Sequence, residues 1–160
     1  MALSLVSLTL DQLLAASTAP EKICGASVAE GALPPDFIIT AAVSALEMGD
    51  AQLWCSFFVF IDANLNEAVG SGGFRGLPNG GRVEIGYGVA ECYRGRGYAT
   101  LAVRQLVDLA MADPEVHEVF AETAVTNPAS RRVVEKAGFR HVGQRDTTSD
   151  GLVDQWLTTS

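Results

Sequence analysis

The sequence predicts a single α/β (α+β) domain covering residues 1–160, in which helices flank a mixed, mostly antiparallel sheet of six to seven strands. Two observations lead to this fold class. Three strand-like segments joined by short turns lie between residues 53 and 90, which is typical of an antiparallel meander. Beyond them, helical and strand-like patterns alternate. A chain of 160 residues with 48% hydrophobic residues is long enough to bury one core.

The first 50 residues predict one strand and two helices. The opening stretch "LSLVSLTL" predicts a strand, and a short helix is expected from Asp11. Residues 37–48, "FIITAAVSALEM", predict a helix that packs on the sheet.

The meander is predicted from composition and turns. Residues 53–61 are dense in aromatic and β-branched residues, so they predict a strand. Turn residues at 63–66 join it to a hairpin partner at 67–74, and the turn "GLPNGG" leads to a third strand at 82–90.

The second half predicts an alternation of helices and strands. Apolar residues recur at three- and four-residue intervals between 98 and 111, which predicts an amphipathic helix that Asp113 and Pro114 end. Residues 117–125 return to a strand pattern. Asn127 then offers an N-cap for another helix, and two strands around the turn "SDG" close the chain.

Composition excludes several classes of function. The formal net charge of −8 argues against nucleic acid as a partner, because phosphates require a basic surface. No apolar run is long enough to span a membrane, and the N-terminus lacks the basic residues of a signal peptide. Three cysteines without a C-x-x-C pair and two histidines predict neither disulfides nor a metal site. We therefore expect a cytoplasmic protein with reduced thiols.

The charge is unevenly distributed along the chain. Before Phe74, Lys22 is the one basic residue among eight acidic ones, whereas the remainder is nearly balanced. This asymmetry fits a cationic substrate on the acidic side and an anion on the arginine-bearing side, although an acid-rich solvated surface explains it equally well.

The strand at 82–90 has one face almost without side chains. Glu84, Gly86 and Gly88 point to the same side, and glycines within a strand mark a bulge or the close approach of a ligand. A bulge that serves only the curvature of the sheet is the structural alternative.

The loop that follows this strand has the features of a phosphate site. It leads into the helix at 98–111, and Gly95 and Gly97 leave the free N–H groups of the helix start accessible to an anion. Arg94 and Arg96 add positive charge. The pattern is neither a P-loop nor a complete dinucleotide fingerprint. A ligand held here by its phosphates and extended along the strand would reach Glu84 after roughly 20 Å, which describes coenzyme A.

Two blocks of the sequence resemble a known family. The segment "RGRGYA" at 94–99 resembles the R/Q-x-x-G-x-G/A signature of the GNAT superfamily of N-acetyltransferases. Together, "IGYGVAECYRGRGYAT" and "TNPASRRVVEKAGFRHVG" resemble its branch that contains the acetyltransferases of ribosomal-protein N-termini. The resemblance implies acetyl-CoA as the donor and a splayed central strand pair that forms the coenzyme A cleft.

The resemblance also implies roles for individual residues. Backbone groups of the strand would bind the pantetheine arm, the loop amides would hold the pyrophosphate, and Asn127 would bond the arm from the next strand. The implied cofactor-binding residues are Tyr87, Gly88, Val89, Arg94, Gly95, Arg96, Gly97, Tyr98, Ala99, Thr100, Asn127 and Ser130. Arg131 and Arg132 are further candidates for the nucleotide phosphates, with a solvated helix face as the alternative for at least one of them.

Catalysis requires a neutral amine, so we expect a carboxylate to accept its proton. Glu84 and Glu122 are the two candidates, and an ordinary surface carboxylate is the alternative for each. The tyrosine that relatives often use as general acid is replaced by Val134, which leaves Ser130 as the substitute.

The sequence therefore predicts an acetyl-CoA-dependent N-acetyltransferase without a metal. Its acceptor would be a small cationic amine or a protein N-terminus, and a homodimer is compatible with the prediction. Because of Val134, an acyl-CoA-binding module with little turnover is the alternative from another class. A dinucleotide-dependent oxidoreductase is disfavoured by the missing third glycine.

Overall fold

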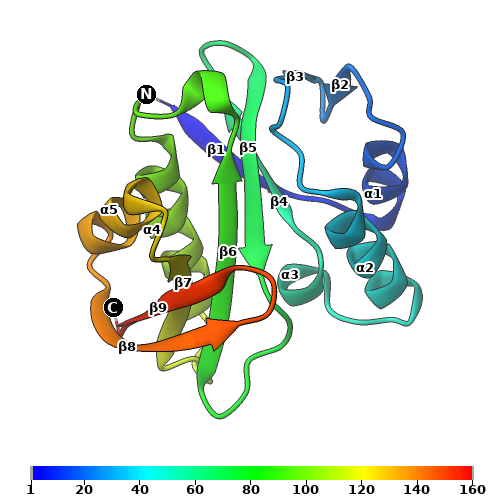
Figure 1. The fold of residues 1–160 in the computed structure, drawn as a ribbon. Coiled ribbons are helices and arrows are strands. Elements are labelled where there is room, and N and C mark those ends of the chain that lie inside the picture. Colours follow the sequence, from blue (N-terminus) through cyan, green and yellow to red (C-terminus); the bar gives the residue numbers. More distant parts are fainter. Residues whose placement is uncertain (1, 160) are drawn as a thin grey trace.

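The computed structural model describes residues 2–159, whose strands form one nine-stranded sheet (Figure 1). The strands are β1 (Leu3–Ser7), β2 (Lys22–Ile23), β3 (Ala26–Val28), β4 (Phe58–Asp62), β5 (Glu67–Phe74), β6 (Arg82–Val89), β7 (Glu118–Ala124), β8 (Arg140–Thr147) and β9 (Gly151–Thr158). The helices are α1 (Leu10–Ala16), α2 (Asp36–Glu47), α3 (Gln52–Cys55), α4 (Tyr98–Met111) and α5 (Pro128–Lys136), with a 3-10 turn at Glu91–Tyr93.

The main path of the sheet runs β1-β4-β5-β6-β7-β9-β8. The mixed, mostly antiparallel sheet flanked by helices is confirmed, but within residues 2–159 it has more strands than the six to seven expected. The additional strands are the short β2 and β3, and β3 pairs in parallel with β5. Neither has an alternating pattern long enough to be recognised in the sequence.

The meander is confirmed, with one wrong boundary. Strands β4, β5 and β6 pair in antiparallel order. The strand expected at 53–61 begins only at Phe58, because Gln52–Cys55 form the helical turn α3. This turn places Trp54 against Phe74 in the core, with ring centroids 4.8 Å apart. A continuous apolar run does not distinguish a buried strand from a buried helical turn.

Alternating residues of β4 reach two separate cores. Phe58 and Phe60 pack with the apolar side of α4 and with Val134 of α5, whereas Val59 on the opposite face packs with α1 and α2. Helices α4 and α5 therefore cover one face of the sheet and α1 and α2 the other, as Figure 1 shows.

Two glycines of β5 allow close packing against β6. A Cβ on Gly72 would lie 2.6 Å from the carbonyl oxygen of Gly86, and a Cβ on Gly70 would overlap that of Gly88. Both would also meet the ring of Phe60. These glycines are required by packing.

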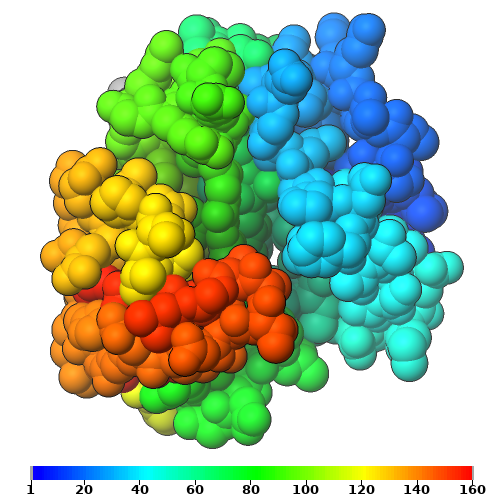
Figure 2. All heavy atoms as spheres, viewed as in Figure 1, coloured from blue at the N-terminus to red at the C-terminus, as the bar shows by residue number. Residues whose placement is uncertain are grey.

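The predicted splayed pair is formed by β6 and β7. The two strands pair in parallel only where Arg82–Glu84 lie opposite Glu118–Phe120, and β7 continues alongside β9. Beyond Glu84 the strands diverge, so an opening forms next to the start of α4. On the molecular surface, β6 lies at the base of a hollow between the β8–β9 hairpin and the segment leading into α2 (Figure 2).

Candidate functional site

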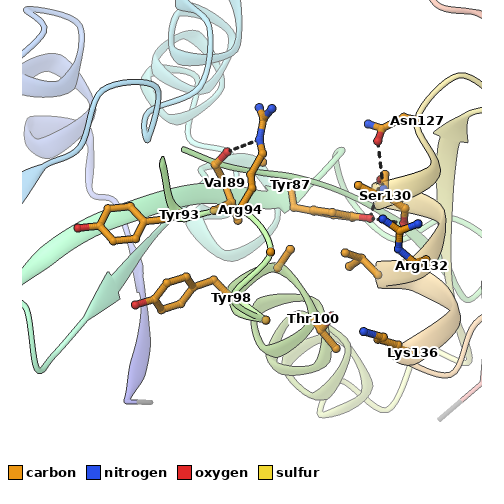
Figure 3. Close-up of a pocket in the computed structure, with 16 residues that line it drawn as sticks. Tyr87, Val89, Tyr93, Arg94, Tyr98, Thr100, Asn127, Ser130, Arg132 and Lys136 are labelled. Atoms are coloured by element: carbon orange, nitrogen blue, oxygen red, sulfur yellow. Dashed lines mark hydrogen bonds between the residues drawn. The ribbon is translucent and has the colours of Figure 1, made fainter. Parts of the chain in front are cut away.

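A groove of about 410 Å³ lies between the end of β6, the start of α4 and helix α5 (Figure 3). It is lined by Tyr87, Gly88, Val89, Tyr93, Arg94, Gly95, Gly97, Tyr98, Ala99, Thr100, Asn127, Ala129, Ser130, Arg132, Val133 and Lys136. All the predicted cofactor-binding residues except Arg96 are thus brought together here, and Arg96 lines an adjoining hollow. Four further residues line the groove that no sequence motif predicted: Tyr93, Ala129, Val133 and Lys136.

The start of α4 is built to accept an anion. Its N-cap, Gly97, has a left-handed φ of 87°, and no side chain caps the helix. Gly95 is also left-handed, with φ 77°. A Cβ at either glycine would meet nothing within 4 Å, so the space beside the loop backbone is open. The N–H groups of a first helical turn lack partners within the helix, and the helix dipole adds positive potential.

Two tyrosines attach the loop between β6 and α4 to the β4–β5 hairpin. The Tyr98 hydroxyl donates to the buried carboxylate of Asp62, which also accepts the N–H groups of Asn64 and Leu65. The Tyr93 hydroxyl donates to Glu67, and this bond together with burial raises the pKa of Tyr93 to about 12. The bond from Tyr98 holds the pKa of Asp62 below its ordinary value. The loop is therefore fixed at both ends.

The opposite wall of the groove comes from α5. Asn127 caps the helix by accepting the N–H of Ser130 at 3.1 Å, as the sequence predicted. The Ser130 hydroxyl lies 2.9 Å from the Tyr87 hydroxyl, which connects β6 to α5 across the opening. Burial raises the pKa of Tyr87. Val134, one turn after Ser130, is fully buried in the core.

The arginines of this region have different environments. Arg94 donates to the carbonyl oxygen of Val89 at 3.2 Å, and Arg132 lines the groove. Arg131 points elsewhere, since it forms ion pairs with Glu135 and Asp154 and lies over the ring of Trp156. Of the two arginines considered for the nucleotide phosphates, only Arg132 is therefore at the groove.

The candidate bases do not line the groove. They lie at the fork, the place where β6 and β7 separate beyond Glu84. Glu84 is in the last paired position of β6 and β7, with the Nε of Arg75 3.3 Å from its carboxylate. Burial raises the pKa of Glu84, although Arg75 opposes this effect. Glu122 accepts two bonds of 2.7 Å from Arg145, which hold its pKa below the ordinary value.

The prediction of a bare face on β6 is wrong at one position. A Cβ on Gly86 would lie 3.0 Å from the Nε of Arg75, so the Arg75 side chain covers that glycine. At Gly88, a Cβ would meet nothing within 4 Å, and this part of the face is open as expected. No local pattern pointed to Arg75, because its contact with Gly86 joins the end of β5 to the neighbouring strand β6.

The groove fits the phosphates of coenzyme A. It offers free N–H groups at a helix start and glycines that leave the backbone accessible, and Arg94, Arg132 and Lys136 line it. Among residues 2–159, no group of three or more His, Cys, Asp or Glu side chains could hold a metal ion. No helix in this part of the chain is long and apolar enough to cross a membrane.

A family model described as "Acetyltransferase (GNAT) domain" matches residues 35–140. The chain is 38% identical over 71 residues to the "Putative ribosomal N-acetyltransferase YdaF" of Bacillus subtilis (strain 168), covering 44% of this chain and 37% of that protein. The chain spans between a third and a half of the first curated relatives it matches.

Solved structures show the same fold over nearly the full length of the chain. An aminoglycoside acetyltransferase, AAC(6')-Ib, in complex with coenzyme A has a TM-score of 0.69 and 22% identity, covering 99% of this chain and 95% of that one. A chimera of the spermidine N-acetyltransferase SpeG from Vibrio cholerae and hSSAT has a TM-score of 0.71 and 16% identity, covering 99% and 96%. At these identities the likeness concerns the fold.

Proposed function

The chain belongs to the GNAT acetyltransferase family, and from this premise we propose that it is an acetyl-CoA-dependent N-acetyltransferase that acetylates a primary amine. The observation that carries the proposal is the uncapped start of α4 beside the fork of β6 and β7. One end of this groove offers N–H groups and cations for phosphates, and the fork lies next to a carboxylate that can accept a proton.

We propose a small cationic amine or a protein N-terminal α-amine as the acceptor. The named activities of related proteins support this class, since they include ribosomal, aminoglycoside and spermidine acetyltransferases. The acid-rich segment before Phe74 supports a cationic acceptor, because that segment supplies α2 and the loop beside the hollow over β6 (Figure 2).

Acetyl-CoA would supply an acetyl group activated as a thioester, and the chain's own residues would prepare the amine. An α-amine has a pKa near ~8 and a lysine-type amine near ~10.4, so either must lose a proton before it attacks. Glu84 is the better base, because burial raises its pKa above its ordinary value and so makes its carboxylate more basic. Glu122 is the weaker candidate, since Arg145 donates to both of its carboxylate oxygens and lowers its pKa, which makes it less basic.

At the opposite side of the fork, the Ser130 hydroxyl would donate a hydrogen bond to the departing sulfur. Tyr87 orients this hydroxyl through their 2.9 Å contact. A thiol has a pKa near ~8.5 and leaves readily, so the absence of a tyrosine at Val134 is compatible with turnover. The three cysteines are free thiols, which supports a cytoplasmic location.

A module that binds acyl-CoA with little turnover is the second candidate, and the burial of Val134 favours it. A mass-spectrometric screen separates the two. Purified protein is incubated with acetyl-CoA and a panel of polyamines, aminoglycosides and N-terminal peptides, and Gly97→Glu serves as the control. We expect an acetylated amine with the wild type alone. Tight coenzyme A binding without an acetylated product from any amine would support the binding module.

A further inference from the structure

A second hollow of about 380 Å³ adjoins the coenzyme A groove and has a basic lining. It is lined by Arg96, Gly97, Thr100, Leu101, Arg104 and Lys136. Gly97, Thr100 and Lys136 also line the groove, so the two spaces share a wall. No Asp or Glu of the described chain lines either space.

The cations of these two spaces are not neutralised by the protein. The chain has 19 acidic and 11 basic residues, yet among residues 2–159 the arginines paired with carboxylates all lie outside these spaces. The five cations that line the spaces have no carboxylate within 4.0 Å in the described structure: Arg94, Arg96, Arg104, Arg132 and Lys136. In an acidic protein, cations gathered without acidic partners indicate a bound anion.

Three of these cations converge on the second hollow from separate elements. Arg104 of α4 donates to the carbonyl oxygen of Lys136 at 2.8 Å, which fixes its guanidinium at the end of α5. Arg96, from the loop, lies over the ring of Tyr93 at 5.2 Å. Lys136 extends towards Thr100 (Figure 3). A phosphate monoester carries about −1.5 to −2 charges at neutral pH and three acceptor oxygens, which matches such a cluster.

We propose that this second hollow binds the 3′-phosphate of coenzyme A, with Arg96, Arg104 and Lys136 as its ligands. The inference rests on the proposed function, since it takes the groove as the coenzyme A site. In coenzyme A a single ribose separates the 3′-phosphate from the pyrophosphate. A pyrophosphate bound at the start of α4 therefore brings the 3′-phosphate to the shared wall. The protein then distinguishes coenzyme A from 3′-dephospho-coenzyme A.

Calorimetric titration with both ligands tests this assignment. We expect the wild type to bind coenzyme A at least about tenfold more tightly than the dephospho form, because a hydrogen bond to a charged group contributes ~1.5–3 kcal/mol. Arg104→Gln and, independently, Arg96→Gln should each remove most of this difference in affinity, because each should weaken the binding of coenzyme A and leave the binding of the dephospho form unchanged. Lys22→Gln, a charge-matched change at the exposed residue of strand β2, should change neither affinity. Thermal melts verify that each variant is folded, and each arginine variant tests the assignment without the other.

Three results would overturn the assignment. One is equal affinity of the wild type for the two ligands. Another is a decrease in affinity by the same factor for both ligands in the arginine variants, which would assign these cations to the pyrophosphate. The third is binding of inorganic phosphate that persists at saturating coenzyme A, which would assign the hollow to another phosphate. Failure to bind either coenzyme would instead contradict the proposed function itself.

Discussion

Replacing Gly97 by glutamate tests the phosphate cradle, by which we mean Gly95, Gly97 and the first backbone N–H groups of α4. The residue is the N-cap of α4 with φ 87°, and a side chain there would project into open space in the groove. A left-handed non-glycine residue costs about 1–2 kcal/mol, which lowers the Tm of a domain of this size by roughly 2–8 °C. A carboxylate about 5 Å from a phosphate charge adds ~1–3 kcal/mol of repulsion. Coenzyme A affinity should therefore fall by roughly 5- to 150-fold, and further if the side chain fills the cradle.

Two alanine variants separate charge from backbone strain. Gly97→Ala has the same strain without the charge. Gly49→Ala has nearly the same geometry, with φ 89° and nothing within 4 Å of its Cβ, but lies at the end of α2. Calorimetry with coenzyme A and thermal melts should show a similar loss of Tm in all three variants and a large loss of affinity in Gly97→Glu. A folded Gly97→Glu protein with wild-type affinity would refute the assignment of the cradle.

Three further predictions concern the carboxylates and glycines of the fork. Because burial raises the pKa of Glu84, its basic form is lost at a higher pH than for an ordinary glutamate. Glu84→Gln should therefore remove the acidic limb of the kcat/KM profile and lower the rate by about 10²–10⁴-fold, and an unchanged limb would exclude this base. Glu122 has a lowered pKa, so its ion pair stabilises the fold above ~4.3 and is lost as pH falls through the lower folded value. Glu122→Gln should accordingly lower Tm at pH 7 but not in acid, and it should leave the acidic limb of the kcat/KM profile in place. Disappearance of that limb in this variant would make Glu122 the base. Gly70→Ala should lower Tm through its clash with β6 while Gly88→Ala leaves Tm unchanged and weakens coenzyme A binding, and equal melts would contradict the distinct roles of these glycines.

Local patterns were sufficient to predict the main elements of the site. The alternation of β6, the apolar periodicity of α4 and the N-cap at Asn127 are each visible within a few residues of sequence. Gly95 and Gly97 were predicted to expose the loop amides, and both adopt the left-handed conformation that glycine favours. These features depend on neighbouring residues, so one sequence contains the information.

Contacts between distant residues could not be predicted in the same way. The bond from Tyr98 to Asp62 joins residues 36 positions apart, and the bond from Tyr93 to Glu67 joins residues 26 positions apart. Arg75 covers Gly86 only because β5 and β6 pair in one particular register. Helix α3 was mistaken for a strand because its apolar residues are continuous with those of β4. Each of these features is set by tertiary packing.

The central claim is that this groove transfers an acetyl group to an amine. The most direct measurement follows thiol release from acetyl-CoA at increasing concentrations of each amine, with product quantified in parallel. We predict saturable release that depends on the amine, matches the acetylated product one to one and is abolished in Gly97→Glu. Saturable coenzyme A binding with no amine-dependent release for any acceptor would contradict the claim.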